Sequence, residues 1–190
     1  MSDQAPAWRA ALIALLGERS VRFGDFVLAS GAHSSYYIDC RLTTMSAPGQ
    51  VLIGGLGLRA IRDAGWEPRS VGGLTMGADP VSYAIAAASA GDEVPIDAFS
   101  VRKEAKQHGT GRRIEGNFEP GDSVVVIEDV ITSGGSALMA ATAIHSAGGK
   151  VIGVLAVVDR EAGGRAKIES AGLPVITLVT AKELGIRDER

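Results

Sequence analysis

The stretch that most constrains this chain is residues 123–136, where an apolar strand runs into a polar turn. Residues 124–127 are Val-Val-Val-Ile, which is typical of a strand buried on both faces of a parallel sheet. The Thr-Ser-Gly-Gly-Ser run at 132–136 predicts a tight turn that opens a helix. A strand–turn–helix unit at this place favours an α/β fold.

Two carboxylates, Glu128 and Asp129, stand between the apolar run and the turn. In an open parallel sheet the ligand crevice lies beyond the carboxyl ends of the strands, where these acids would project. Backbone N–H groups and hydroxyls at a helix start suit a phosphate monoester, and glycines let it approach the backbone closely. The acids suit ribose hydroxyls or a hydrated divalent cation, so the stretch predicts a sugar-phosphate site. The turn residues are Thr132, Ser133, Gly134, Gly135 and Ser136.

Strands and helices alternate over most of the chain. This alternation implies right-handed βαβ units and a central parallel sheet flanked by helices. A length of 190 residues favours one domain over residues 1–190. Strands are expected near 70–74, 96–101, 123–131, 151–158 and 175–179, and helices near 46–64, 79–90, 135–147 and 162–171.

The N-terminal part predicts a packing helix from Pro6 to Gly17 and then two short strands, at 21–29 and 34–39. The two strands would form a small flap outside the main sheet. The expected helix at 46–64 contains three glycines in its middle, Gly54, Gly55 and Gly57, which weaken a helix and so indicate close packing on a neighbour.

Composition excludes several classes of protein. A formal net charge of -3 argues against bulk attraction to nucleic acid or anionic membrane, and no apolar run reaches transmembrane length. Residues 1–9 lack the pattern of a secretory signal, and the single cysteine, Cys40, excludes an intrachain disulfide. We therefore expect a cytoplasmic protein in which Cys40 is an ordinary thiol.

A basic segment separates the strands expected at 96–101 and 123–131. Residues 102–116 hold five Lys or Arg and two Glu, a local charge of +3. With three glycines and few apolar residues, the segment predicts a long mobile loop over roughly 102–118. It would act as a lid that gathers basic side chains around a pyrophosphate; the alternative is a solvated charged loop.

Two other places would carry ligand contacts. The glycines of the segment 72–80 would expose N–H groups to a second phosphate, or the segment is a structural turn with Asp79 as N-cap and Pro80 as the first helical residue. Arg160 follows the strand expected at 151–158 and would bind a substrate carboxylate, or would form a surface ion pair with Asp159 or Glu161. His33 and His145 show no metal-ligand spacing with each other.

Three segments together resemble one enzyme family. The run Val-Ile-Glu-Asp-Val-Ile-Thr-Ser-Gly-Gly-Ser at 126–136 resembles the signature with which type I phosphoribosyltransferases bind phosphoribosyl pyrophosphate (PRPP). Ser-Gly-x-x-Ser-x-Tyr-Tyr-x-Asp at 30–39 and Arg-Lys-Glu-x-Lys-x-His-Gly at 102–109 resemble segments of orotate phosphoribosyltransferases. The first signature is shared by many phosphoribosyltransferases, whereas the combination is specific.

The resemblance implies a type I phosphoribosyltransferase fold, with a five-stranded parallel core and an N-terminal hood over roughly 1–45. It implies transfer of ribose 5-phosphate from PRPP to orotate in pyrimidine biosynthesis, with Mg2+ carried by PRPP near Asp129. It also implies a homodimer whose basic loop reaches into the partner's site. The rival interpretations are a phosphoribosyltransferase for another base and a PRPP-sensing regulator without catalysis.

The resemblance also assigns roles to single residues. For PRPP these are Glu128, Asp129, Val130, Ile131, Thr132, Ser133, Gly134, Gly135 and Ser136, and for its pyrophosphate they are the catalytic set Arg102, Lys103, Lys106 and His108. For orotate they are Thr132, Arg160 and, through their backbone, Tyr37 and Ile38. The chain departs from many family members at Ala29 and Met76, where a lysine is common.

Overall fold

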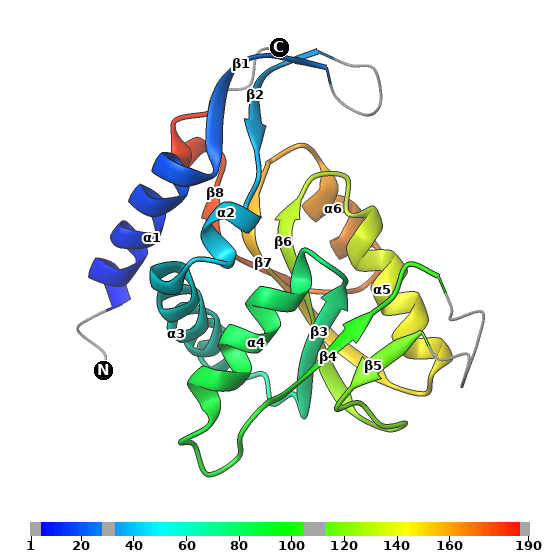
Figure 1. Cartoon of the computed structure of the whole chain (residues 1–190). Coiled ribbons are helices and arrows are strands. Elements are labelled where there is room, and N and C mark those ends of the chain that lie inside the picture. Colours follow the sequence, from blue (N-terminus) through cyan, green and yellow to red (C-terminus); the bar gives the residue numbers. More distant parts are fainter. Residues whose placement is uncertain (1–4, 28–32, 105–112, 187–190) are drawn as a thin grey trace.

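The computed structural model describes residues 5–27, 33–104 and 113–186, and a six-stranded sheet lies at its centre (Figure 1). The strand order is β5-β4-β3-β6-β7-β8. Five strands run parallel and β5 pairs antiparallel with β4 at one edge. The strands are β3 (Ser70–Leu74), β4 (Asp97–Val101), β5 (Ile114–Gly116), β6 (Ser123–Ile131), β7 (Lys150–Asp159) and β8 (Val175–Thr180).

Helices cover both faces of this sheet (Figure 1). On β6, Val125 and Ile127 pack into a core shared with α1, α3 and α4, whereas Val124 and Val126 pack into a second core with α5 and α6. Alternate side chains of a strand point to opposite faces, so β6 is buried on both sides as its apolar run predicts. The helices are α1 (Ala5–Arg19), α2 (Arg41–Thr44), α3 (Ala47–Asp63), α4 (Ala78–Ser89), α5 (Gly135–Ser146) and α6 (Gly164–Ser170), with a 3-10 helix η1 (Lys182–Leu184).

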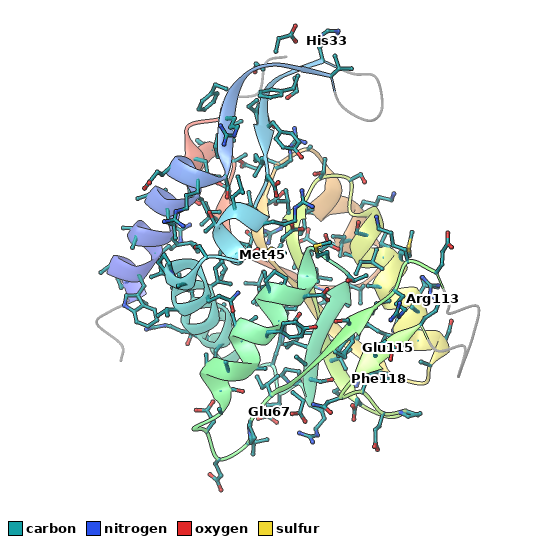
Figure 2. All side chains as sticks on the ribbon, in the orientation of Figure 1. His33, Met45, Glu67, Arg113, Glu115 and Phe118 are labelled. Carbon is teal, nitrogen blue, oxygen red and sulfur yellow. The ribbon has the colours of Figure 1, made fainter. Side chains whose placement is uncertain are left out.

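The predicted flap is an antiparallel pair of strands, β1 (Val21–Val27) and β2 (His33–Ile38). Figure 1 shows it standing out from the sheet at one end of the molecule. Near its far end the exposed His33 lies 3.0 Å from Asp25, measured from Nδ1 to Oδ1 (Figure 2). The inner end of β2 leads directly to the carboxyl edge of the sheet, so the hood contributes to whatever binds there.

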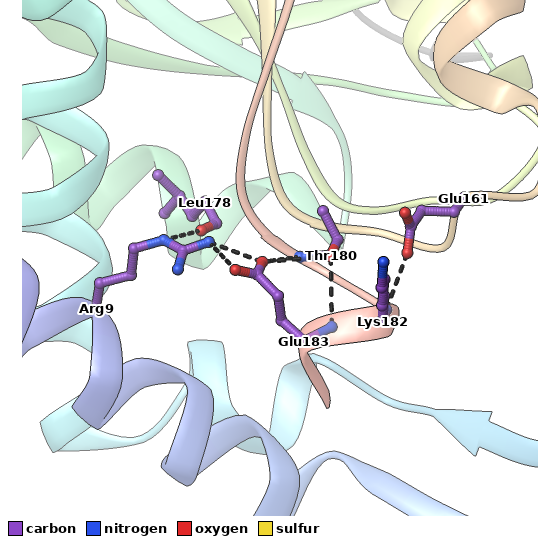
Figure 3. Close-up of polar contacts among 6 residues, drawn as sticks. All are labelled: Arg9, Glu161, Leu178, Thr180, Lys182 and Glu183. Atoms are coloured by element: carbon purple, nitrogen blue, oxygen red, sulfur yellow. Dashed lines mark hydrogen bonds and ion pairs between the residues drawn. The ribbon is translucent and has the colours of Figure 1, made fainter. Parts of the chain in front are cut away.

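A polar cluster ties α1 to the last strand (Figure 3). The Arg9 guanidinium donates to the backbone oxygen of Leu178 at 3.1 Å and to both carboxylate oxygens of Glu183 at 2.6 and 2.7 Å. Glu183 also accepts the N–H of Thr180 at 2.9 Å. These contacts join the two ends of the described chain beneath the hood.

Most predicted elements are confirmed, and β3 and β6 have the predicted bounds. Ser46 caps α3 by accepting the N–H of Gly49 at 3.1 Å. The glycines of α3 do allow close packing, since a Cβ at Gly54 would lie 2.5 Å from the Ala84 oxygen and one at Gly55 would overlap the Trp8 ring.

Two predictions about the fold are wrong, and one α-helix was not predicted. α1 does not stop at Gly17 but continues to Arg19. The segment 102–118 is not loop throughout, because β5 lies within it. The short helix α2 was not predicted. Among the described residues, no helix is both long enough and apolar enough to cross a membrane.

Candidate active site

A cleft of about 650 Å³ opens at the carboxyl ends of β3 and β6. Five separate segments of chain meet there: the end of β2 with the residues up to Arg41, the β3–α4 connection, the residues just after β4, the end of β6 with the start of α5, and the residue after β7. The lining residues that the sequence predicted are Tyr37, Ile38, Lys103, Glu128, Asp129, Val130, Thr132, Ser136 and Arg160.

Glu128 is buried at the floor of this cleft. Glu128 is only 7% exposed, and its Oε1 has no hydrogen-bond partner in the described part of the chain. Burial, together with the neighbouring charge of Asp129, raises the pKa of Glu128 to about 8. A buried oxygen without a partner is costly unless a ligand supplies the missing hydrogen bond.

Asp129 is the second acid of the pair. Its Oδ1 accepts the N–H of Val130 at 2.9 Å, and burial raises its pKa while this backbone bond and the charge of Arg41 act in the opposite direction. Across the cleft, a Cβ on Gly77 would lie 2.6 Å from Asp129 Oδ1. Because Gly77 has no side chain, there is space for the Asp129 carboxylate at this position.

The polar turn after β6 opens α5 as predicted. Gly134 has φ +72°, and a Cβ there would lie 2.7 Å from the backbone oxygen of Gly164. Both features require glycine. Thr132 and Ser136 are exposed and line the cleft, whereas the structure does not place Ile131, Ser133, Gly134 and Gly135 among the lining residues.

The β3–α4 connection is braced by Asp79. The hydroxyl of Thr75 donates to its Oδ2 at 2.6 Å, and that of Ser100 donates to its Oδ1 at 2.7 Å. The prediction that Asp79 is the N-cap of α4 is wrong, because Gly77 occupies that position. Thr75, Met76, Gly77 and Ala78 line the cleft.

The prediction that the glycines of 72–80 expose N–H groups is wrong for Gly72 and Gly73. Both are buried inside β3, where added Cβ atoms would meet the backbone oxygens of Phe99 and Ile127. Their role is close strand packing, and Gly77 alone of the three glycines reaches the cleft.

The hood contributes Tyr37 and Ile38, as predicted, and also Arg41, which sequence reasoning missed. Arg41 donates to both oxygens of Asp39, at 2.8 and 2.9 Å. Its guanidinium lowers the pKa of Asp39. The signal for Arg41 was its place two residues after an acid at a strand end, but nothing in the pattern showed that the chain turns there into α2.

Arg160 reaches the cleft without either ion pair considered for it. Its Nε and Nη2 donate to the Tyr36 hydroxyl at 3.2 and 2.9 Å, and the guanidinium carbon lies 4.8 Å from the centre of the Tyr36 ring. Asp159 instead accepts the N–H of Glu161 at 2.8 Å. The sequence placed Tyr36 in the hood segment but did not predict its contact with Arg160.

The basic segment is described only at its ends. Lys103 lines the cleft. Arg102 does not, because its Nε donates to Glu115 at 3.1 Å while its backbone pairs with Arg113. Figure 2 shows Arg113 and Glu115 on the β5 side of the molecule. Lys106 and His108, like Ala29, lie outside the described residues.

The donor set suits a metal brought by a ligand better than one held by the protein alone. Among the described residues, no group of three or more His, Cys, Asp or Glu side chains is placed to hold a metal ion. Mg2+ commonly binds one or two carboxylates together with substrate phosphates and waters. Asp129 and Glu128 fit that arrangement.

Comparison with known proteins agrees with this geometry. A model of the phosphoribosyl transferase domain matches residues 51–172. Orotate phosphoribosyltransferase of Rhodopirellula baltica is 43% identical over 189 residues, covering 97% of this chain and 98% of the relative. The chain belongs to the orotate phosphoribosyltransferase family.

Other members of the family lead to the same assignment. The orotate phosphoribosyltransferase of Aquifex aeolicus is 46% identical over an alignment that covers 93% of this chain and 97% of the relative. The Mycobacterium tuberculosis orotate phosphoribosyltransferase in complex with PRPP superposes with a TM-score of 0.76 at 37% identity, covering 94% of this chain and 92% of that one. The predicted fold class, with parallel sheet and hood, is therefore confirmed.

Proposed function

We propose that this protein transfers the 5-phosphoribosyl group of PRPP to N1 of orotate, giving orotidine 5'-monophosphate and pyrophosphate. The observation that carries the proposal is one cleft that joins the acid pair and hydroxyl turn of β6–α5 to the guanidinium of Arg160. The first part suits a ribose phosphate and the second suits the carboxylate of the base. Near full-length similarity to orotate phosphoribosyltransferases supports the same reaction.

The proposed PRPP site uses the β6–α5 connection. Glu128 and Asp129 would accept hydrogen bonds from the ribose hydroxyls, which would give Glu128 Oε1 the partner that it lacks in the described part of the protein. Thr132 and Ser136, with the N–H groups at the start of α5, would bind the 5-phosphate. Ile131, Ser133, Gly134 and Gly135 would shape that turn without lining the cleft.

The proposed pyrophosphate site lies toward Lys103 and the β3–α4 connection. Lys103 lines the cleft and would stabilise negative charge as it develops on the leaving group. Lys106 and His108, from the same segment, would join it. Arg102 is the weakest member of this set, since its guanidinium is engaged with Glu115.

The proposed orotate site lies between the hood and Arg160. The backbone of Tyr37 and Ile38 would flank the base, and Arg160 would pair with its carboxylate. Thr132 follows the acid pair closely in the sequence and lines the same cleft as Arg160, so its hydroxyl would contact both substrates. Adenine and hypoxanthine carry no carboxylate for the guanidinium.

The chemistry requires no nucleophile from the protein. The bond from ribose C1 to pyrophosphate breaks with its electron pair on the leaving oxygen, N1 of orotate bonds to C1, and N1 gives up its proton. Positive charge develops on the ribose ring beside Glu128 and Asp129, whose carboxylates would stabilise it. Bound Mg2+, carried by PRPP close to Asp129, would supply neutralisation of the pyrophosphate charge.

We also propose that two copies of the chain share their active sites. An apolar patch of Leu42, Met45 and Met76, each about half exposed, adjoins the cleft beside Arg41. Met45, labelled in Figure 2, directly follows α2. An exposed apolar patch continuous with a polar site suits a second copy, which would bring its basic segment to the cleft.

The reaction is tested by incubating the purified protein with PRPP, Mg2+ and a panel of bases: orotate, uracil, adenine and hypoxanthine. We expect pyrophosphate release with orotate and formation of orotidine 5'-monophosphate. Release with another base instead would support a different phosphoribosyltransferase. PRPP binding without release for any base would support the regulator.

Sharing of sites is tested by mixing Lys106→Ala and Arg160→Ala variants after separate purification and subunit exchange. If Lys106 acts in the partner's site, half of the dimers are mixed and each has one intact site, so about a quarter of the wild-type activity returns. No recovery, with exchange verified by mass, would show that Lys106 acts within its own subunit.

A further inference from the structure

The contact between Tyr36 and Arg160 is the polar link between the hood and the residue after β7. Tyr36 belongs to β2 and is only 9% exposed, whereas Arg160 is half-buried and lines the cleft. The Tyr36 side chain itself is not among the lining residues. Tyr36 can therefore influence a ligand in the cleft only through the side chain that it holds.

The two hydrogen bonds occupy one particular edge of the guanidinium. Nε and Nη2, which form its side-on edge, both donate to the single Tyr36 oxygen. A guanidinium offers a carboxylate either this edge or the end-on edge formed by Nη1 and Nη2. With the side-on edge occupied, the end-on edge remains for a ligand, and Nη1 has no partner among the described residues.

The backbone that carries Arg160 is held on both sides. The Arg160 N–H donates to Ile131 O at 3.0 Å, at the end of β6. The next residue, Glu161, has φ +57°, and its carboxylate accepts the N–H of Lys182 at 2.9 Å (Figure 3). Because the backbone is fixed, the direction of the guanidinium depends on its side-chain torsions, and Tyr36 restrains those.

Resting on the proposed function, we propose that the Tyr36 hydroxyl is a positioning residue for substrate specificity. It holds Arg160 so that the end-on edge of the guanidinium faces the cleft and meets the carboxylate of the pyrimidine. The ring contributes as well, since it lies against the cation at 4.8 Å and replaces water on that side. Binding of orotate then costs little of the entropy needed to order a long side chain.

The matched pair of nucleotides that tests this inference is orotidine 5'-monophosphate and uridine 5'-monophosphate, which differ only by the carboxylate. Their two dissociation constants, measured by calorimetry for one protein, give a ratio that isolates carboxylate recognition from binding of the phosphate and ribose. A general loss of folding or of cleft shape would weaken the binding of both nucleotides and leave the ratio of their dissociation constants unchanged.

The variants are Tyr36→Phe, which keeps the ring and removes only the hydroxyl, Arg160→Ala, and both together. Tyr83→Phe is the control, because Tyr83 is an exposed tyrosine whose hydroxyl lies 3.1 Å from that of Ser100, outside the Arg160 contact. We expect Tyr36→Phe to lower the preference for the orotidine nucleotide about tenfold, equivalent to about 1.4 kcal/mol. Uridine 5'-monophosphate and PRPP should bind as in the wild type.

The double variant should show no more loss of preference than Arg160→Ala alone, because Tyr36 acts through Arg160. A Tyr36→Phe ratio equal to the wild-type ratio, with Arg160→Ala losing it, would overturn the inference and leave the proposed function intact. A wild-type protein that does not distinguish the two nucleotides would instead contradict the role of Arg160 in the proposed function.

Discussion

Two carboxylates near the cleft, that of Asp79 in the first turn of α4 and that of Glu128 near the end of β6, have different surroundings in the protein. Asp79 accepts hydroxyl hydrogens on both oxygens, from Thr75 and from Ser100. Glu128 is more deeply buried, yet its Oε1 has no partner in the described part of the chain. The difference separates a carboxylate that holds the scaffold from one that is left for a ligand.

This contrast explains why a protein would keep a costly group. A satisfied carboxylate at Asp79 joins the ends of β3 and β4 and fixes the connection that faces Asp129 across the cleft. An unsatisfied one at Glu128 reduces the stability of the unliganded protein, and ligand binding recovers that free energy when ribose hydroxyls reach it. Replacing each side chain in turn tests the contrast.

The largest effect is expected from removing both charges of the acid pair. The double variant Glu128→Gln, Asp129→Asn keeps the shapes but loses two charge-assisted hydrogen bonds, so kcat/KM for PRPP should fall by roughly 100–1000-fold. Steady-state release of pyrophosphate measures this. Asp63→Asn, an exposed acid on α3, is the control. A loss below about threefold would show that the pair does not bind the substrate.

Truncating Asp79 should act on stability instead. Asp79→Ala leaves the hydroxyls of Thr75 and Ser100 without their acceptor and should lower the free energy of unfolding by about 2 kcal/mol. Urea denaturation measures the loss, and Asp79→Asn, which retains an acceptor oxygen, should lose less. An Asp79→Ala variant as stable as the wild type would remove its role as a brace.

A methyl group at Gly77 should disturb Asp129 from the opposite side of the cleft. Its Cβ would lie 2.6 Å from Asp129 Oδ1, so the carboxylate must move. We expect the KM for PRPP to rise by about tenfold, since small displacements at a reacting site are costly. Gly91→Ala, where an added Cβ meets nothing within 4 Å, is the control. Equal KM values for the two variants would contradict the predicted contact.

The smallest effect concerns Glu128 and pH in the absence of ligand. Its pKa of about 8 in the folded protein lies above the ordinary value of 4.5. Between pH 4.5 and about pH 8 the folded state therefore binds more protons than the unfolded state. Stability must then decrease as pH rises from about 4.5 to 8. The variant Glu128→Gln has no proton to lose and escapes this decrease.

Glu128→Gln should therefore be more stable than the wild type at about pH 8.5 by about 1 kcal/mol, or about 2–4 °C in Tm, because the buried amide retains part of the cost. The advantage should shrink toward about pH 5. Thermal unfolding with EDTA present measures both values. An advantage that is constant with pH would assign the effect to packing.

Sequence was sufficient where one local rule decides the structure. The Val-Val-Val-Ile run determined β6 because such a run has no polar face to expose, and the acids and hydroxyls after it lie at the predicted edge. The start of α3 near residue 46 was predictable for a similar reason, since capping by Ser46 is a contact between near neighbours.

Sequence was insufficient where distant segments meet. The partner of Arg160 is Tyr36, 124 residues away, so the nearby acids Asp159 and Glu161 were the natural candidates and both were wrong. Asp79 was misassigned as a cap because its two carboxylate oxygens accept hydrogen bonds from the hydroxyls of Thr75 and of Ser100, which lies on the neighbouring strand. β5 is three residues long and exists by pairing with β4, which no periodicity can reveal.

The central claim is that the buried carboxyl group of Glu128 obtains its missing hydrogen bond from a ligand. Proton release on PRPP binding tests this claim most directly. At about pH 7 a carboxyl with a pKa of about 8 is mostly protonated, and hydrogen bonds from ribose hydroxyls favour its ionised form. Calorimetric titrations with Mg2+ and PRPP, in buffers of different ionisation enthalpy, give the number of protons released. We predict that the wild type releases close to one proton more than Glu128→Gln; equal numbers for the two proteins would contradict the account.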